Sequence, residues 1–314
     1  MRTLIVIFCS VCLLQELAAQ KEVVVLHVSG QAQYYVQYGA QPVSMYPGLE
    51  IDLKGKVRCK GTGSAKLLYN GNTFLVSGTK MRDVQEVVKA AGPASQMSFT
   101  GRFFNFVTES VKESETNDQL EKHHRRYMSN ASGGIKGWAK PGFNIVPILI
   151  ASGKLPSANV IFKWRNAAGQ GPYTFSLLNS SSKIIAQLVV RDTFLTLNLE
   201  QLAINLDEEY TWDISRGENA KSVAVPFSVC PAGTTDKQNE LAHEATYQTA
   251  DATEKQLMLA FSLEEEKCFY NANNTYAQLL AANPNNVLLR RMYAAFMARM
   301  NMLPEADALI SSPH

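Results

Sequence analysis

The sequence has little excess charge, few cysteines and no long apolar run beyond its N-terminus. Thirty Lys and Arg against 28 Asp and Glu leave a net charge of +2, so no global basic field is present for binding nucleic acid. Five cysteines in 314 residues are too few for a disulfide scaffold. Beyond the N-terminal segment no apolar run reaches the ~18 residues of a membrane-spanning helix, and we expect no membrane span.

Motifs of the common catalytic and metal sites are missing as well. There is no Gly-x-Ser-x-Gly, no phosphate loop and no His-Glu-x-x-His, and no Cys-x-x-Cys follows the N-terminal segment. His123 and His124 are adjacent, so on a helix their side chains point about 100° apart and do not clamp one ion. We interpret them as a solvated helix end, with a hydrolase that pairs either histidine with a carboxylate as the alternative hypothesis. We therefore predict no catalytic residue, no metal site, no cofactor and no enzyme.

Hydrophobic residues make up 46% of the chain, enough for real cores, and the length is typical of about two domains. The N-terminus carries an export signal, because Arg2 precedes an apolar run from Leu4 to Leu14, and Ala18 and Ala19 follow. A basic start, a short apolar stretch and small residues are typical of a secretory signal peptide. We expect residues 1–19 to be this signal and the protein to reach the periplasm or the cell surface.

Three cysteines follow the signal, namely Cys59, Cys230 and Cys268. An odd number leaves at least one thiol free or paired between molecules. Cys59 alternates with Val57 on the buried face of an expected strand, where a thiol acts as a small hydrophobe. Cys230 and Cys268 are the candidate disulfide, and the alternative is that both stay free.

Residues 20–90 show the pattern of a compact all-β domain. Apolar and polar residues alternate from Val24 to Val36, which predicts a strand with one buried face. Gly30 interrupts this run and indicates a bulge. Pro47-Gly48 marks a turn, and Asn70-Gly71 predicts a tight hairpin between two further strands.

This segment resembles the FecR-type domain, named for the iron-dicitrate sensor. The stretches that carry the resemblance are Val28-Ser29-Gly30-Gln31-Ala32, Tyr46-Pro47-Gly48-Leu49-Glu50-Ile51 and residues 61–76. The resemblance covers about a fifth of the chain and implies the β fold of that family. It also raises one functional alternative, a FecR-like signalling accessory without its own membrane helix.

Residues 91–143 change composition, and we expect a helical linker there. Phe99, Phe103 and Phe106 fall at helical spacing and form an apolar stripe. Such a stripe docks on a neighbouring domain or forms a groove for a partner. Trp138 is the aromatic residue of this segment that best suits a partner or a cell-wall glycan.

Residues 144–230 return to strand alternation, with about seven strands expected. One-sided alternation over many short strands predicts a two-sheet β-sandwich. The Phe162–Trp164 and Tyr210–Trp212 stretches make the segment similar to immunoglobulin-like or fibronectin III-like domains. Tyr210 occupies the place of a tyrosine corner, whose hydroxyl bonds upstream backbone. We expect Trp164 and Trp212 in the core.

Residues 235–314 are helical and repeat themselves. Ala260 and Ala294 lie 34 residues apart, as do Ala272 and Ala306. This period with small residues at helix crossings is the signature of tetratricopeptide repeats. About one and a half repeats fit, so we expect the array to pack on the sandwich or on another molecule. The residues nominated for partner binding are Tyr276, Tyr293, Arg290, Arg291 and Trp138.

These segments predict a multidomain α+β protein: an N-terminal FecR-like β-domain, a central β-sandwich and C-terminal helical hairpins. The domain order resembles that of envelope proteins of Gram-negative, Bacteroides-type bacteria. The function that we expect is a non-catalytic exported module or scaffold that binds a protein partner through its C-terminal helices. The alternative is a module that binds cell-wall glycan.

Overall fold

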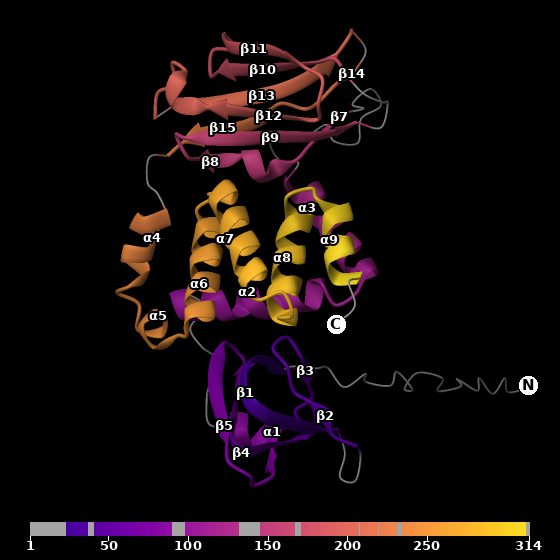
Figure 1. The fold of residues 1–314 in the computed structure, drawn as a ribbon, viewed down its shortest axis with the longest axis vertical. Coiled ribbons are helices and arrows are strands. Elements are labelled where there is room, and N and C mark those ends of the chain that lie inside the picture. The colour runs from indigo at the N-terminus through magenta and orange to yellow at the C-terminus, as the bar shows by residue number, and fades with distance from the viewer. Residues whose placement is uncertain are drawn as a thin grey trace, which may run out of the picture. The chain divides into compact units, whose positions relative to one another are not determined.

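The computed structural model describes residues 23–36, 41–89, 98–131, 145–166, 171–206, 208–218, 220–230 and 234–311. The chain divides into two compact units, Met1–Gly92 and Pro93–His314. The architecture is α+β, with sheets in the N-terminal and central parts and helices at the C-terminus (Figure 1). The predicted signal peptide, residues 1–19, lies outside the described residues.

The first unit is an antiparallel sheet built on two long strands. β1 (Val23–Tyr35) pairs with β4 (Lys56–Tyr69), and β5 (Asn72–Ser77) pairs with the opposite edge of β4. The short elements are β2 (Val43–Ser44), β3 (Glu50–Ile51), β6 (Arg82–Asp83) and helix α1 (Val84–Val88). The unit therefore adds one short helix to the expected β fold.

Glycines and one asparagine shape this sheet at the two places where the sequence predicted a bulge and a hairpin turn. Asn70 and Gly71 have φ values of 48° and 74°, and two successive left-handed residues form the favoured two-residue hairpin. The register shifts between Ser29 and Gln31, around Gly30. A Cβ on Gly63 would lie 2.7 Å from the carbonyl oxygen of Gln31, because the two strands approach closely at this bulge. The hairpin and the bulge are both confirmed.

The core of the first unit lies on one face of this sheet. Cys59 is 1% exposed, and its thiol lies 3.5 Å from the carbonyl oxygen of Val76. Burial raises the pKa of this thiol, so it is held in the neutral form and packs as a small apolar side chain. The other buried side chains include Val25, Tyr34, Ile51, Val57, Leu67 and Val84.

The second unit contains two sheets. The larger runs in the order β11-β10-β13-β15-β8, with β14 paired to β13, and the smaller in the order β12-β9-β7. β8 pairs with β15 in parallel, and the other pairs are antiparallel. The strands are β7 (Ile145–Pro147), β8 (Gly153–Leu155), β9 (Asn159–Asn166), β10 (Tyr173–Asn179), β11 (Ile184–Val190), β12 (Phe194–Asn198), β13 (Glu209–Arg216), β14 (Ala220–Lys221) and β15 (Val225–Val229).

Aromatic side chains join the two sheets face to face. Phe162 of the smaller sheet lies 5.1 Å from Phe175 and 5.4 Å from Trp212 of the larger sheet, between ring centroids. Both pairs are edge-on, the arrangement that aromatic quadrupoles favour. Trp164 and Trp212 are 2% and 0% exposed, which confirms their prediction as core residues. The Trp212 indole donates a hydrogen bond to the carbonyl of Ala151 at 2.7 Å.

Tyr210 is the second residue of β13 and closes the turn that precedes the strand. Its hydroxyl accepts a hydrogen bond from the backbone N–H of Asn205 at 2.7 Å and donates to Glu208 at 3.0 Å. The side chain is 1% exposed. A bond from a buried tyrosine hydroxyl to backbone a few residues upstream is the predicted corner geometry.

The Tyr210→Phe variant is expected to lower the free energy of unfolding of the second unit by about 1–2 kcal/mol, because the N–H of Asn205 loses its acceptor. Urea denaturation followed by tryptophan fluorescence measures this loss, since all three tryptophans belong to the second unit. Tyr46→Phe, at an exposed tyrosine of the first unit, is the control. An equal effect of both variants would contradict the corner.

The helices of the second unit form one bundle. They are α2 (Phe99–Glu113), α3 (Asn117–Ala131), α4 (Thr234–Leu241), α5 (Ala245–Thr249), α6 (Ala252–Glu265), α7 (Phe269–Ala282), α8 (Val287–Arg299) and α9 (Leu303–Ser311). α2 and α3 both contact α8, and α3 also contacts α9. In Figure 1 the magenta α2 and α3 accordingly accompany the yellow C-terminal helices.

The segment expected as a linker is thus an integral part of this bundle. The rings of Phe99, Phe103 and Phe106 lie 5.7, 5.7 and 4.9 Å from that of Phe261 on α6. The predicted apolar stripe therefore docks within the second unit, which is the first of the two alternatives. Phe103 is 2% exposed, and Phe99 and Phe106 are half-buried, because α6 presents an aromatic ring to all three.

The C-terminal helices reproduce the 34-residue period as two hairpins. α6 packs on α7, and α8 packs on α9. Ala260, Ala272, Ala294 and Ala306 are all 0% exposed, because small side chains at the crossings let paired helices approach closely. A local cap fixes where α6 begins, because Asp251 and Glu254 form a capping box at its N-terminus.

Hydrogen bonds tie the sheets to the bundle. The N–H of Lys154 on β8 donates to the carbonyl of Lys267, just before α7, at 2.8 Å. A short 3₁₀ helix, η1 (Leu149–Ala151), contacts α7, and the N–H of Leu149 donates to the carbonyl of Met300. Arg165 on β9 donates to the carbonyl of Asn301 at 2.7 Å. The expected packing of the helical array on the sheets is therefore present.

Candidate functional site

A groove lies on the outer side of the C-terminal hairpins, which we call the α7–α9 groove. Its volume is about 430 Å³, and it is lined by Ala277, Leu280, Ala281, Pro284, Asn285, Arg290, Tyr293 and Leu309. Ala277 and Ala281 are exposed and lie one turn apart on α7. Their small side chains leave the space between α7, α8 and α9 open.

One aromatic and one cation give the groove its polar character. The ring of Tyr293 stacks on that of Tyr276 at 5.6 Å, and its hydroxyl donates to Asn273 at 3.1 Å. Burial raises the pKa of Tyr293 to about 12, so the hydroxyl stays protonated and remains a donor. Arg290 is the charged member of the lining and is 6% exposed. The groove therefore combines an apolar floor with a single positive charge.

The residues nominated for partner binding separate into four groups. Arg290 and Tyr293 line the groove, whereas Arg291 is part-exposed on α8 outside the lining. Tyr276 is 1% exposed, so its assignment to a binding surface is corrected. The structure places it in the bundle core, because its position in the repeat faces the crossing of α7 with α6 and α8. Trp138 lies outside the described residues.

Tyr276 belongs to a buried ionic network that organises the bundle. Arg299 and Glu264 are 12% and 8% exposed and lie 2.8 Å apart, and the Tyr276 hydroxyl donates to the same carboxylate at 2.8 Å. The guanidinium also lies over the ring of Phe106 at 5.1 Å. Burial alone would lower the pKa of Arg299, but the carboxylate of Glu264 raises it above the usual value. The network joins α2, α6, α7 and α8.

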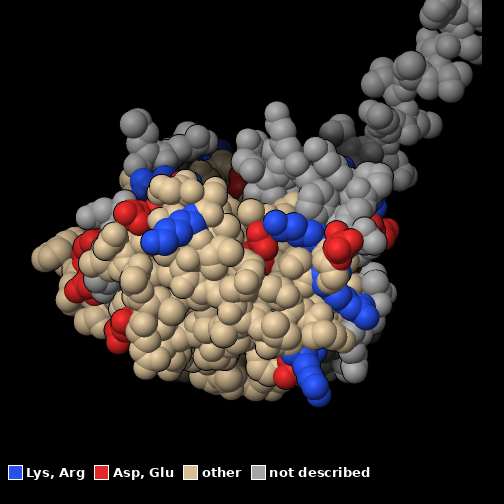
Figure 2. Space-filling model, turned by 90° about the horizontal axis from the view of Figure 1, so that it is seen from above, with Lys and Arg blue, Asp and Glu red and all other residues tan. Residues whose placement is uncertain are grey.

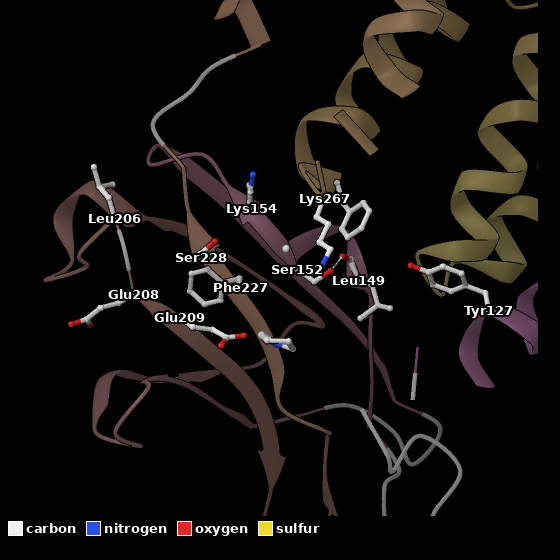
Figure 3. A pocket seen from close by; sticks show the side chains of 13 residues that line it. Tyr127, Leu149, Ser152, Lys154, Leu206, Glu208, Glu209, Phe227, Ser228 and Lys267 are labelled. Atoms are coloured by element: carbon white, nitrogen blue, oxygen red, sulfur yellow. Dashed lines mark hydrogen bonds between the residues drawn. The ribbon is translucent and has the colours of Figure 1, made fainter. Parts of the chain in front are cut away.

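A second cavity, which we call the junction cavity, lies where the larger sheet meets the bundle. Its volume is about 640 Å³. Figure 3 shows Phe227 and Ser228 of β15 beside Lys154 of β8, with Lys267 of the bundle near Leu149 and Ser152. Glu208 and Glu209 lie on the sheet side and Tyr127 on the helix side. Two lysines and two glutamates balance one another, so the lining has no net charge.

The two adjacent histidines have different and mostly structural surroundings. His123 is 8% exposed, and its Nδ1 lies 2.9 Å from Glu113, which corrects its interpretation as a solvated helix end. His124 is part-buried, and its Nδ1 lies 2.8 Å from the carbonyl of Ala298 on α8. A carbonyl only accepts, so this nitrogen carries the proton. Both side chains fasten α3 to its neighbours because the tertiary packing of α3 turns them inward.

Within the parts of the chain that the structure describes, no group of three or more His, Cys, Asp or Glu side chains is arranged to hold a metal ion. No described helix is long and apolar enough to cross a membrane. Cys59, Cys230 and Cys268 are free thiols in the structure. The candidate disulfide between Cys230 and Cys268 is therefore not formed in this state.

The larger sheet ends in an apolar edge strand. β11 is the last strand of its order and contains no charged residue. Ile184, Leu188, Val189 and the nearby Phe194 are 51%, 40%, 75% and 50% exposed. Figure 2 looks onto the side of the second unit that carries β11 in Figure 1, and the face it shows is largely uncharged, with charged side chains near its margin. Such an edge lacks the charges that usually prevent strand addition.

Comparison of the chain with protein-family models finds no match, and comparison with curated proteins finds no significant match. What defines the protein is therefore its own architecture: a small β unit, followed by a unit of two sheets packed on a helical bundle with a 34-residue period.

Proposed function

We propose that the chain is a non-catalytic, exported envelope protein that binds a protein partner through its C-terminal helices. The same proposal assigns a family likeness to each part of the chain. The first unit is FecR-like, the two sheets are immunoglobulin- or fibronectin III-like, and the C-terminal hairpins are tetratricopeptide-like. The proposal is supported by the 34-residue helical period, by the corner of Tyr210 and by an open groove on the outer hairpins.

The α7–α9 groove is the observation that carries this function. Its floor is apolar, and Arg290 is the charged residue of its lining. α7 contains no charged residue, and the first turns of α8 carry Arg290 and Arg291. The third arginine of α8, Arg299, is paired with Glu264 in the bundle core, and the acidic residues of α9, Glu305 and Asp307, do not line the groove. A surface of this kind fits an acidic segment that inserts an aliphatic side chain, because the apolar floor buries the side chain and the positive charge of Arg290 attracts the carboxylates.

The Ala281→Trp variant tests the groove, because an indole at this exposed position fills the space that the partner's side chain would occupy. The probes are two fluorescent 12-residue peptide pools that carry a leucine beside either glutamates or lysines. We expect the full chain to bind the glutamate pool more tightly than the lysine pool. Ala281→Trp is expected to weaken binding at least about tenfold, as measured by fluorescence anisotropy.

The matched control is Ala282→Trp. Ala282 is the exposed neighbour on the same helix and does not line the groove, so this variant is expected to bind like the unchanged chain. Circular dichroism verifies that both variants keep their helix content. Equal binding of the two pools, or an equal loss in both variants, would contradict the proposal.

A further inference from the structure

Two thiols that are far apart in the sequence meet where the larger sheet joins the bundle. Cys230 follows β15, and its N–H donates to the carbonyl of Leu155 at 2.9 Å. Cys268 immediately precedes α7 and follows Lys267, whose carbonyl accepts from Lys154 at 2.8 Å. Two hydrogen bonds through the consecutive residues 154 and 155 therefore hold the two cysteines near each other, beside the junction cavity.

The two thiols differ in exposure. Cys268 is 7% exposed, and its sulfur lies 3.9 Å from the carbonyl oxygen of Glu266. Burial raises the pKa of this thiol to about 11, and its electrostatic interaction with Cys230 adds to the rise. Cys230 is part-exposed, so a reagent in solution reaches it first.

We propose that Cys230 and Cys268 form an oxidation site that closes into an intramolecular disulfide when the chain meets a small disulfide oxidant such as oxidised glutathione. The thiolate of Cys230 attacks one glutathione sulfur and releases the other glutathione as a thiolate. The thiolate of Cys268 then attacks the sulfur of Cys230 and releases the second glutathione. The oxidant gains two electrons, the two cysteine thiols lose their protons to solvent, and one protein disulfide forms.

The second step depends on pH because Cys268 has to ionise. Lys154 and Lys237 favour its thiolate, whereas burial and Glu266 oppose it. The opposing charge of Cys230 is absent at this step, because its sulfur then carries glutathione. The pKa of about 11 lies above neutral pH, so the thiolate fraction of Cys268 rises about tenfold for each pH unit between 7 and 9. The rate of ring closure is expected to rise in the same proportion.

Closure would also lock the sheets to the bundle. The bond joins the end of β15 to the start of α7 and closes a loop of about 40 residues, which restricts the unfolded chain. The midpoint of thermal unfolding of the second unit is therefore expected to rise by about 5–10 °C. This effect does not depend on the partner proposed for the α7–α9 groove.

The experiment incubates the full chain with oxidised glutathione and then maps its thiols by alkylation, proteolysis and mass spectrometry without reductant. We expect a peptide pair linked through Cys230 and Cys268, and a higher unfolding midpoint that reductant reverses. Cys268→Ser is expected to keep one glutathione on Cys230 and to abolish the rise. Cys59→Ser, which removes a buried thiol of the first unit, is expected to change neither result.

Two outcomes would overturn the inference. One is oxidised protein in which Cys230 carries glutathione while Cys268 stays a thiol at every ratio of oxidised to reduced glutathione. The other is a disulfide of either cysteine that links two chains. Each would show that the two sulfurs do not reach bonding geometry within one molecule.

Discussion

Replacement of Gly153 by alanine is expected to destabilise the second unit by about 2–5 kcal/mol. Gly153 has a φ of 70°, which alanine adopts at a cost of about 1–2 kcal/mol. A Cβ there would also lie 2.2 Å from the carbonyl oxygen of Lys267. That carbonyl accepts from Lys154, and the N–H groups of Lys267 and Cys268 bond back to α6, so the backbone has little room to retreat and overpacking adds about 1–3 kcal/mol.

Gly217→Ala provides the comparison for this prediction. Gly217 has a similar φ of 58°, but a Cβ built on it would have no neighbour within 4 Å. Only the backbone strain applies, and the expected loss is about 1–2 kcal/mol. Urea titrations of both variants, followed by tryptophan fluorescence, measure the two losses. Equal losses would mean that the close contact between β8 and the bundle contributes nothing to stability.

Replacement of Arg299 by methionine is expected to lower the free energy of unfolding by about 3–5 kcal/mol. The variant keeps an unbranched apolar stem but leaves the carboxylate of Glu264, which is 8% exposed, without its cation. An unpaired buried carboxylate keeps its desolvation penalty and loses the Coulombic attraction that offset it. The Tyr276 hydroxyl still donates to this carboxylate, but a neutral donor compensates only part of the loss.

A neighbouring ion pair supplies the control for Arg299→Met. Arg102 pairs with Glu265, the next residue along α6, at 2.8 Å, but these side chains are 43% and 33% exposed. Arg102→Met is therefore expected to cost at most about 1 kcal/mol, because water screens exposed pairs and replaces their partners. Denaturation in urea measures both variants, and a similar cost for each would refute the assignment of Arg299 as a buried structural cation.

The sequence predicted best where one local signal suffices. Asn70-Gly71 forms a hairpin because few other pairs adopt two successive left-handed conformations. The corner of Tyr210 needs only backbone a few residues upstream. The alanines of the 34-residue period are buried because each hairpin repeats the same crossing. These features depend on residues close together in the chain or on a regular spacing.

The predictions went wrong where the answer depended on a distant partner. Periodicity showed that Phe99 and Phe103 share an apolar face, but it did not show that Phe261 would receive them and make a linker part of the bundle. His123 was interpreted as solvated because Glu113, its partner, lies on a different helix. Tyr276 was nominated for binding because its spacing marks a repeat position. That spacing does not indicate which side of the helix pair faces solvent, and Tyr276 is buried.

The amino-acid sequence by itself determined the order of strands and helices, the turns and the helical repeat, because these follow from backbone preferences and from the spacing of apolar residues. Only the tertiary structure decided which side chains meet. It buried Tyr276 with Arg299 and Glu264, opened the α7–α9 groove around Arg290, and held the segments of Cys230 and Cys268 against the consecutive residues 155 and 154 of β8. Such contacts arise when separate elements pack, and spacing along one element does not encode the surface that another element will present.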